Sequence, residues 1–251
     1  MDALLKWFWS LFAAKKSADV IPLKPGTVIA PKPIEVVAPV QLKPSGKKTL
    51  GIDVSHYEPA LDWSKAKLGG VEWMYTKATE GAAHVDSSLH MHVGSAKGAG
   101  VLTGAYHFFH ANIDGAVQAH LYLKTVAGMN LELPHCLDWE SSSSDGQSSA
   151  KQQLEAKKWL DIVEAATGKV PMIYGGLSHL KDLKLGPEFA RYPLWLAHYG
   201  VSSTLVPAPW KEYTAWQFTD AGSVPGLASG HHVDTNWFNG SIEELRNFAK
   251  G

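Results

Sequence analysis

Three consecutive segments in the middle of the chain decide the fold: HCLDWE at 135–140, SAKQQLEAKKWLDIVEAAT at 149–167 and VPMIY at 170–174. The first and third are short apolar runs, which are typical of buried strands. In the second, apolar side chains recur at helical spacing (Leu154, Trp159, Ile162, Val163 and Ala166). A strand, a helix and a second strand in this order predict two neighbouring parallel strands joined by a crossover helix.

The same alternation continues on both sides of this unit. Further helices are predicted at 86–97 and 114–126, whereas prolines and glycines leave no room for a crossover helix at 199–213 or 220–231. These features predict an α/β fold, an irregular TIM-like barrel with about five helices, in which the last strands connect by loops or hairpins. A doubly wound open sheet is the alternative, but no G-x-G-x-x-G follows a strand. The eight predicted strands are 50–54, 73–78, 101–108, 135–140, 170–174, 194–198, 213–218 and 232–235.

The composition excludes several classes of protein. The 251 residues include one cysteine, Cys136, which excludes an internal disulfide framework and a cysteine-based zinc cluster. A formal charge of −1 gives no support for nucleic-acid binding. Ten Trp and eight Tyr suit both a core and a groove that stacks against sugar rings. We expect a monomer that needs no cofactor.

The N-terminal part differs from the predicted barrel domain at 49–251. Residues 1–16 begin with the apolar stretch MDALLKWFWSLFAA, which is too short to span a bilayer but suits a helix lying in the membrane interface. Six prolines make residues 17–48 a semi-extended linker. Eight lysines against three acidic residues give residues 1–48 a formal charge of +5, which favours an anionic membrane surface. An atypical secretory signal and a terminus docked on the domain remain alternatives.

Polar side chains that could serve in catalysis or binding lie at or just after the predicted strand ends. Because the carboxyl ends of parallel barrel strands share one rim, we expect them to converge there. Carboxylates crowded into one cleft cannot all ionise without cost, so at least one pKa must rise. The side chains concerned are Asp53, Glu80, Asp138, Glu140, Tyr174, Tyr199, Gln217 and Asp234.

Asp138-Trp139-Glu140 is the most informative of these groups. In a strand, the first and third residues face the same side and the middle one faces away. Paired carboxyl groups on one face are the working parts of glycoside hydrolysis, in which one group must hold a proton for the leaving oxygen. We predict that Glu140 holds this proton beside an ionised Asp138. A metal site is not predicted, because the pairs His90 and His92, His107 and His110, and His231 and His232 lack ligand spacing such as H-E-x-x-H.

The motifs together resemble family 25 of the glycoside hydrolases, the lysozyme-type N-acetylmuramidases of phages, bacteria and fungi. They follow the family's order over about residues 50–240. The similar segments are GIDVS at 51–55, KATEG at 77–81, GAYHF at 104–108, DWE at 138–140, IYG at 173–175, LWLAHY at 194–199, WQ at 216–217 and VDTN at 233–236.

The resemblance implies cleavage of the β-1,4 bond between N-acetylmuramic acid and N-acetylglucosamine in peptidoglycan glycan strands. It implies that Glu140 is the general acid and that Asp138 assists the substrate's own acetamido group in a retaining mechanism. Asp53 and Asp234 match two further acidic residues of the catalytic floor. Residues that match the substrate-binding groove are Glu80, Tyr106, Tyr174, Trp195, Tyr199 and Gln217. The sequence departs from the family pattern at Glu58, Thr76 and His84.

Two other functions and two locations stay open at this stage. The same groove without turnover would make a non-catalytic peptidoglycan-binding envelope protein, and the linker would also suit a structural envelope protein. Action on the cell envelope fits a phage endolysin held in the host cytoplasm or at the inner membrane until lysis. Export to the periplasm or the extracellular space is the alternative.

Overall fold

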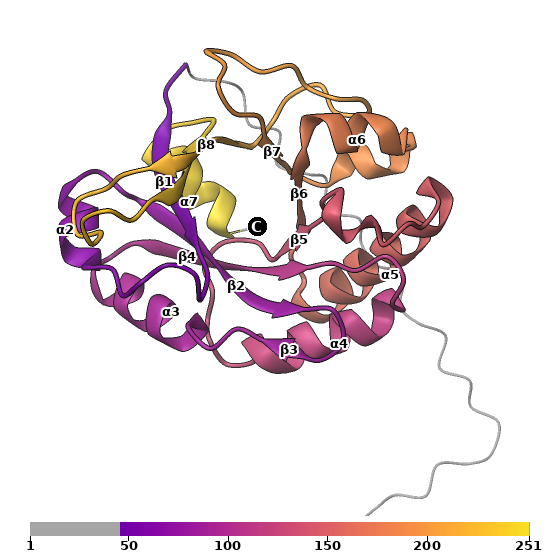
Figure 1. Ribbon diagram of the computed structural model, residues 1–251, viewed down its shortest axis with the longest axis horizontal. Coiled ribbons are helices and arrows are strands. Elements are labelled where there is room, and N and C mark those ends of the chain that lie inside the picture. The colour runs from indigo at the N-terminus through magenta and orange to yellow at the C-terminus, as the bar shows by residue number, and fades with distance from the viewer. Residues whose placement is uncertain (1–45, 251) are drawn as a thin grey trace, which may run out of the picture. The chain divides into compact units, whose positions relative to one another are not determined.

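A computed structural model describes residues 46–250, and in it eight strands close into a barrel (Figure 1). The strand order is β1-β9-β8-β7-β6-β5-β4-β2, and pairing of β1 with β2 closes the ring. This confirms the predicted barrel. The strands are β1 (Thr49–Val54), β2 (Trp73–Glu80), β4 (Leu102–Phe108), β5 (Cys136–Asp138), β6 (Met172–Gly176), β7 (Leu194–Ala197), β8 (Ala215–Gly222) and β9 (Val233–Phe238).

The predicted N-terminal segment 1–16 and nearly all of the linker 17–48 lie outside the described residues. Within residues 46–250, no helix has both the length and the apolar character needed to cross a membrane.

The last strand runs against the rest of the barrel. β9 is antiparallel to both of its neighbours, β8 and β1, while the other neighbouring barrel strands pair in parallel. This agrees with the prediction that the last strands connect by loops or hairpins. A short additional strand, β3 (His84–Val85), pairs with the end of β2 outside the ring and was not predicted.

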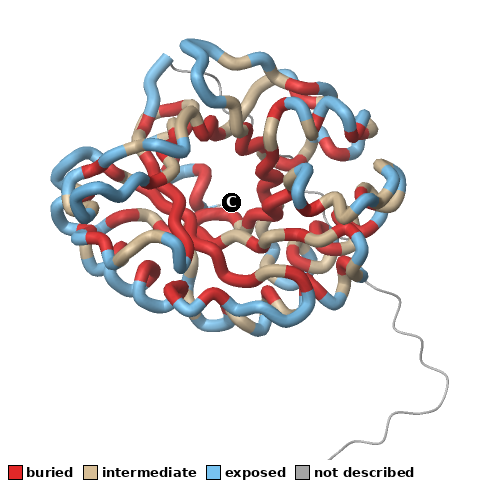
Figure 2. Tube along the Cα trace, viewed as in Figure 1, coloured by how far each residue is buried: buried red, intermediate tan, exposed pale blue. Residues whose placement is uncertain are grey.

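Six α-helices, against the five or so expected, surround the strands in the described part of the chain. The longest, α5, has Ser148 as its N-cap and ends at Gly168, whose φ of 71° suits a residue without a side chain. Figure 2 shows that the barrel wall is buried while the outer surfaces of the helices are exposed. The helices are α2 (Trp63–Leu68), α3 (Leu89–Gly98), α4 (Gly115–Val126), α5 (Ser149–Thr167), α6 (Leu177–Leu183) and α7 (Ile242–Lys250).

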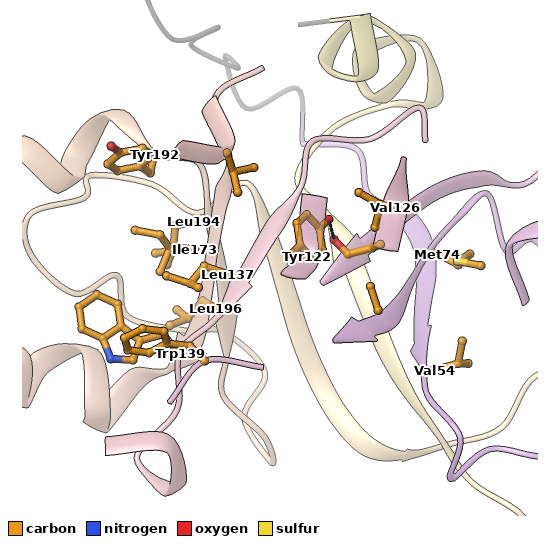
Figure 3. Close-up of a cluster of buried hydrophobic side chains, with 14 of the residues drawn as sticks. Val54, Met74, Tyr122, Val126, Leu137, Trp139, Ile173, Tyr192, Leu194 and Leu196 are labelled. Atoms are coloured by element: carbon orange, nitrogen blue, oxygen red, sulfur yellow. Dashed lines mark hydrogen bonds between the residues drawn. The ribbon is translucent and has the colours of Figure 1, made fainter. Parts of the chain in front are cut away.

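One hydrophobic core lies between the barrel wall and the helices (Figure 3). Leu137, Ile173 and Leu194 come from three neighbouring strands and pack in this layer. Tyr122 of α4 is fully buried against the wall, and its hydroxyl donates a hydrogen bond to the Ala105 carbonyl oxygen at 2.9 Å. Burial of this apolar layer fixes which face of each strand points outward.

A second core fills the barrel interior and forms the floor of the site. The rings of Tyr75 and Trp195 lie with their centroids 5.0 Å apart, and Trp73 packs on both. A Cβ atom at Gly51 would stand 2.1 Å from the Trp73 ring, so the interior has room for this indole because position 51 carries no side chain. Since side chains alternate along a strand, residues two positions beyond this floor form the next layer towards the rim.

Candidate active site

A cavity of about 210 Å³ opens at the carboxyl ends of the parallel strands, directly above the aromatic floor. All four acidic residues predicted to be catalytic line it: Asp53, Asp138, Glu140 and Asp234. Of the residues predicted to bind substrate, three line it as well: Tyr106, Tyr174 and Trp195. Glu80, Tyr199 and Gln217 lie outside its lining.

Asp138 and Glu140 face this cavity, while Trp139 between them points the other way. Asp138 is the last residue of β5 and is 6% exposed. Trp139 is fully buried in the outer core, where its ring contacts those of Phe109 and Phe189. The predicted alternation is therefore correct, although the strand ends at Asp138 and Glu140 belongs to the following loop.

The loop that carries Glu140 is held by its own serines. The Glu140 backbone N–H donates a hydrogen bond to the Ser143 hydroxyl at 3.0 Å, and the Ser142 hydroxyl donates one to the Glu140 carboxylate at 3.0 Å. Within this run of serines, residues Ser142–Ser144 form one turn of 3₁₀ helix. This turn gives the Glu140 carboxyl group a defined position at the cavity.

The depth of Asp138 affects the charge state that its carboxyl group favours. Burial raises the pKa of Asp138 well above its usual range, and the negative charges of Glu140 and Asp53 raise it further. The Asp138 Oδ1 atom is buried and has no hydrogen-bond partner among the described residues. In the substrate-free cavity, burial therefore favours the protonated form of Asp138, which differs from the ionised state expected for this residue from the sequence.

Asp53 and Asp234 form a second pair of carboxyl groups, across two neighbouring strands. Their Cα atoms are register partners of β1 and β9. Asp234 was predicted at the end of its strand but lies near the start of β9, and it reaches the rim because this strand runs in the opposite direction. Burial raises the pKa of Asp53 to about 6, and burial together with the charge of Asp53 raises that of Asp234 to about 9.

Two amide side chains hold this second pair in place. The Asn236 Nδ2 atom donates a hydrogen bond to Asp53 at 2.7 Å, and the Gln217 Nε2 atom donates to Asp53 at 2.9 Å and to Asp234 at 3.3 Å. The Oε1 atom of Gln217 accepts hydrogen bonds from the hydroxyls of Tyr174, at 2.7 Å, and Tyr199. Gln217 is therefore placed behind the cavity, where it fixes the positions of four polar side chains.

Trp195 supports this network from below. Its side chain is only 1% exposed, and its Nε1 atom donates a hydrogen bond to Asn236 Oδ1 at 2.8 Å. The ring packs edge-on against Tyr174 with centroids 4.9 Å apart. Such a buried indole orients Asn236 and, through it, Asp53, rather than presenting an open face for stacking.

Lys77 and Asn236 were quoted in motifs but not predicted as site residues. Lys77 lines the cavity, is 7% exposed and pairs with Glu80 at 2.5 Å between Nζ and Oε2. The signal was present in the sequence, because Lys77 lies two residues beyond Tyr75 and Asn236 two residues beyond Asp234, each on the same strand face.

Glu80 lies behind Lys77 and not in the cavity. Burial opposes its ionisation, but hydrogen bonds from Lys77 and His110 outweigh this and lower the pKa of Glu80. His110 lies 3.1 Å from Glu80 through Nε2 and 3.1 Å from Asp145 through Nδ1. Since Asp145 belongs to the loop that follows Glu140, His110 connects this loop to the end of β2.

The raised pKa of Asp234 predicts a stability effect that depends on pH. A carboxyl group whose pKa is higher in the folded state stabilises the protein at pH below its unfolded value of 3.8, and this contribution is lost as the pH rises to about 9. Asp234→Asn removes the ionisation but keeps the shape. We expect a variant about as stable as the wild type at pH 4 and more stable at pH 9, with a melting temperature higher by several degrees.

Thermal unfolding of both proteins between pH 4 and 9 measures this difference. Asp182→Asn, at an exposed aspartate of α6 away from this pair, serves as the control and should show no such trend. A melting-temperature difference between Asp234→Asn and wild type that stays constant with pH would contradict the assignment of a bound proton to this pair.

Comparison with known proteins agrees with this geometry. The sequence profile named "Glycosyl hydrolases family 25" matches residues 52–227. Lysozyme M1 from Streptomyces globisporus is 33% identical over 205 residues, which cover 78% of this chain and 69% of the relative. An N,O-diacetylmuramidase from Chalaropsis sp is 32% identical over 216 residues, covering 80% of this chain and 99% of the relative.

A solved structure is similar in fold as well as in sequence. The crystal structure of the bacterial lysozyme from Streptomyces coelicolor superposes with a TM-score of 0.76 at 31% identity, covering 81% of this chain and 98% of that one. The profile match spans most of the barrel and includes Asp53, Asp138 and Glu140. The chain therefore belongs to family 25 of the glycosyl hydrolases, enzymes that hydrolyse glycosidic bonds.

Proposed function

We propose that this protein cleaves the β-1,4 bond between N-acetylmuramic acid and N-acetylglucosamine in peptidoglycan. The observation that carries the proposal is that Asp53, Asp138, Glu140 and Asp234 line a single cavity. Hydrolysis of an acetal needs a proton donor for the leaving oxygen and negative charge near the anomeric carbon, and carboxyl groups supply both. The names of the relatives, lysozyme and N,O-diacetylmuramidase, support this substrate class.

Glu140 is the general acid in this proposal. It lies at the mouth of the cavity, and it also lines a neighbouring cavity of about 340 Å³ together with Tyr174 and Tyr199. A proton donor that separates two cavities can reach the oxygen between two sugars bound on either side of it. The side chain of Tyr199 is 41% exposed and offers a ring face and a hydroxyl to the sugar in the second cavity.

Asp138 acts on the acetamido group of the sugar whose anomeric carbon reacts. The unpartnered Oδ1 atom of Asp138 is an acceptor for the acetamido N–H. This hydrogen bond favours the ionised form of Asp138, and the proton of the carboxyl pair then lies on Glu140, because the two carboxyls repel each other when both are charged. Substrate binding would thus create the charge state that the reaction needs.

Asp53 and Asp234 stabilise the positive charge that develops as the bond breaks. Burial disfavours their ionisation in the empty cavity. A positive charge on the substrate relieves this cost, so their electrostatic contribution is larger in the transition state than in the ground state, which is the condition for catalysis. The hydrogen bonds from Gln217 and Asn236 hold them in position beforehand.

The end group of the product distinguishes the proposed bond from its neighbour in the same polymer. Purified peptidoglycan is digested, the new reducing ends are reduced with borohydride, and the resulting sugar alcohol is identified after acid hydrolysis. Cleavage on the proposed side yields the alcohol of muramic acid. The alcohol of glucosamine would identify a glucosaminidase instead, and no new reducing end would favour the non-catalytic binding protein.

The proposal also assigns a place of action. A monomeric enzyme attached to the inner membrane by residues 1–16 and held on the cytoplasmic side until lysis fits a phage endolysin, because Lys15 and Lys16 favour retention of the following chain on that side. We expect the full chain to sediment with anionic liposomes and a chain lacking residues 1–16 to stay in the supernatant. Equal sedimentation of both would rule out this attachment.

A further inference from the structure

Two histidines and an aspartate meet beside the cavity without being part of it. His56 follows β1, His84 lies in β3, and Asp86 comes directly after β3. One donor atom from each of the three side chains lies within 4.8 Å of the other two. We propose that His56, His84 and Asp86 bind a divalent cation of the zinc class.

The chemistry of the three donors matches this cation. Two imidazole nitrogens and one carboxylate oxygen form a ligand set that zinc accepts, and a solvent molecule completes a tetrahedral site. Ligand atoms of such a tetrahedral site lie roughly 3.4 Å apart for metal–ligand distances of about 2.1 Å. His56 Nδ1 and Asp86 Oδ2 are already 2.7 Å apart. A cation that takes both atoms displaces the proton that they share.

Asp86 is held in place before any cation arrives. Its carboxyl group is fully buried, and its Oδ1 atom accepts hydrogen bonds from the Ser88 backbone N–H at 2.9 Å and the Ser88 hydroxyl at 2.6 Å. The Oδ2 atom accepts from the His56 backbone N–H at 3.1 Å. A ligand whose position is fixed by neighbouring groups needs little ordering when the metal binds.

His84 is the movable member of the group. It is exposed, its ring centroid lies 5.9 Å from that of His56, and its side chain makes no hydrogen bond with any residue in the described range. Rotation of this side chain closes the remaining gap without breaking another interaction. Coordination would add a role for this exposed histidine, which lies beside a second histidine and a buried carboxylate.

The cation would connect two segments of the rim. His56 lies between Ser55 and Tyr57, which both line the active-site cavity, whereas His84 belongs to the hairpin formed by β2 and β3 and Asp86 directly follows this hairpin. A ligand that binds only the folded state stabilises the folded state by mass action. The melting temperature should therefore rise by roughly 5 °C at a zinc concentration about 100 times the dissociation constant.

Calorimetric titration of zinc chloride into the chelator-treated full chain tests this site. We expect one equivalent to bind, and His84→Ala to weaken binding at least tenfold and to abolish the rise in melting temperature. The matched control is His231→Ala, which removes one exposed histidine of the adjacent pair at 231–232 and should leave binding unchanged. His56→Ala provides a second variant at the site.

The location of the metal is checked by anomalous scattering at the zinc edge from crystals of the same protein. A single peak between His56, His84 and Asp86 is expected. The proposal is overturned if the wild type binds no zinc, if His84→Ala binds it as tightly as the wild type, or if only the His231→Ala variant loses it. None of these readouts depends on the hydrolytic activity.

Discussion

Replacing Glu140 with Gln is expected to lower the rate of reducing-end release from peptidoglycan by about 10³-fold, within the range that a general acid supplies. Glutamine keeps the size of the side chain and can still accept the hydrogen bond from Ser142, but it has no proton to give to the leaving oxygen. Because Glu140 lies at the cavity mouth and packs in no core, the melting temperature should change by less than about 2 °C.

Glu58→Gln is the matched control for this experiment. Glu58 lines the same cavity, and its carboxylate accepts hydrogen bonds from the Ser55 backbone N–H at 2.6 Å and the Ser55 hydroxyl at 3.1 Å. Its loss should reduce turnover by less than about tenfold, since it orders a loop and transfers no proton. If both variants lose activity equally, or if Glu140→Gln keeps a tenth of the wild-type rate, Glu140 is not the general acid.

Replacing Asp138 with Asn should separate activity from stability. We expect kcat to fall by about 10²-fold with little change in KM, because the neutral amide cannot carry the negative charge that the acetamido group requires in the transition state. At pH 8 the melting temperature should rise, by roughly 2–4 °C for each 1 kcal/mol gained in a domain of this size.

The sign of the stability change follows from the direction of the pKa shift. Burial raises the pKa of Asp138, so the protonated carboxyl stabilises the fold at low pH, and this contribution is lost as the pH rises through the folded-state value. Asparagine does not ionise, so its advantage should grow with pH and vanish near pH 4. Lower stability of Asp138→Asn at pH 8, or unchanged turnover, would contradict the role given to this residue.

The barrel could be predicted because each of its strands carries a local signal. The apolar segments at 73–78, 170–174 and 194–198 are followed by turns or helices, and their order determines the parallel pairing. The reversed direction of β9 could only be inferred in part, from the glycines before it. Strand β3 contains only His84 and Val85, and a pair of residues carries too little periodicity to be recognised.

The positions of side chains could be predicted where they follow from sequence spacing. Properties that depend on how deeply a side chain is buried could not. The D-x-E spacing and strand alternation placed Asp138 and Glu140 correctly, because both are properties of neighbouring residues. The raised pKa of Asp138 could not be assigned to this carboxyl from the sequence, since it results mainly from burial among residues of several strands. The same holds for Trp195, whose buried ring lines the cavity and donates a hydrogen bond to Asn236.

The His56, His84 and Asp86 group illustrates the same limit. His56 and Asp86 are 30 residues apart, and only the pairing of β2 with β3 brings His84 beside them. The sequence departs from the family pattern at His84. That His84 lies beside His56 and Asp86 could not be predicted, because the hairpin brings them together. Residues from separate segments can be recognised as one group only when the fold is known.

A crystal structure of the inactive Glu140→Gln variant with a bound peptidoglycan oligosaccharide tests the central claim most directly. We predict that the scissile oxygen lies about 2.6–3.2 Å from the side chain at position 140 and that the acetamido nitrogen of the adjoining sugar lies within the same distance of Asp138. An oligosaccharide that binds elsewhere on the barrel, or that places its scissile bond away from both side chains, would show that these carboxyls do not perform the cleavage.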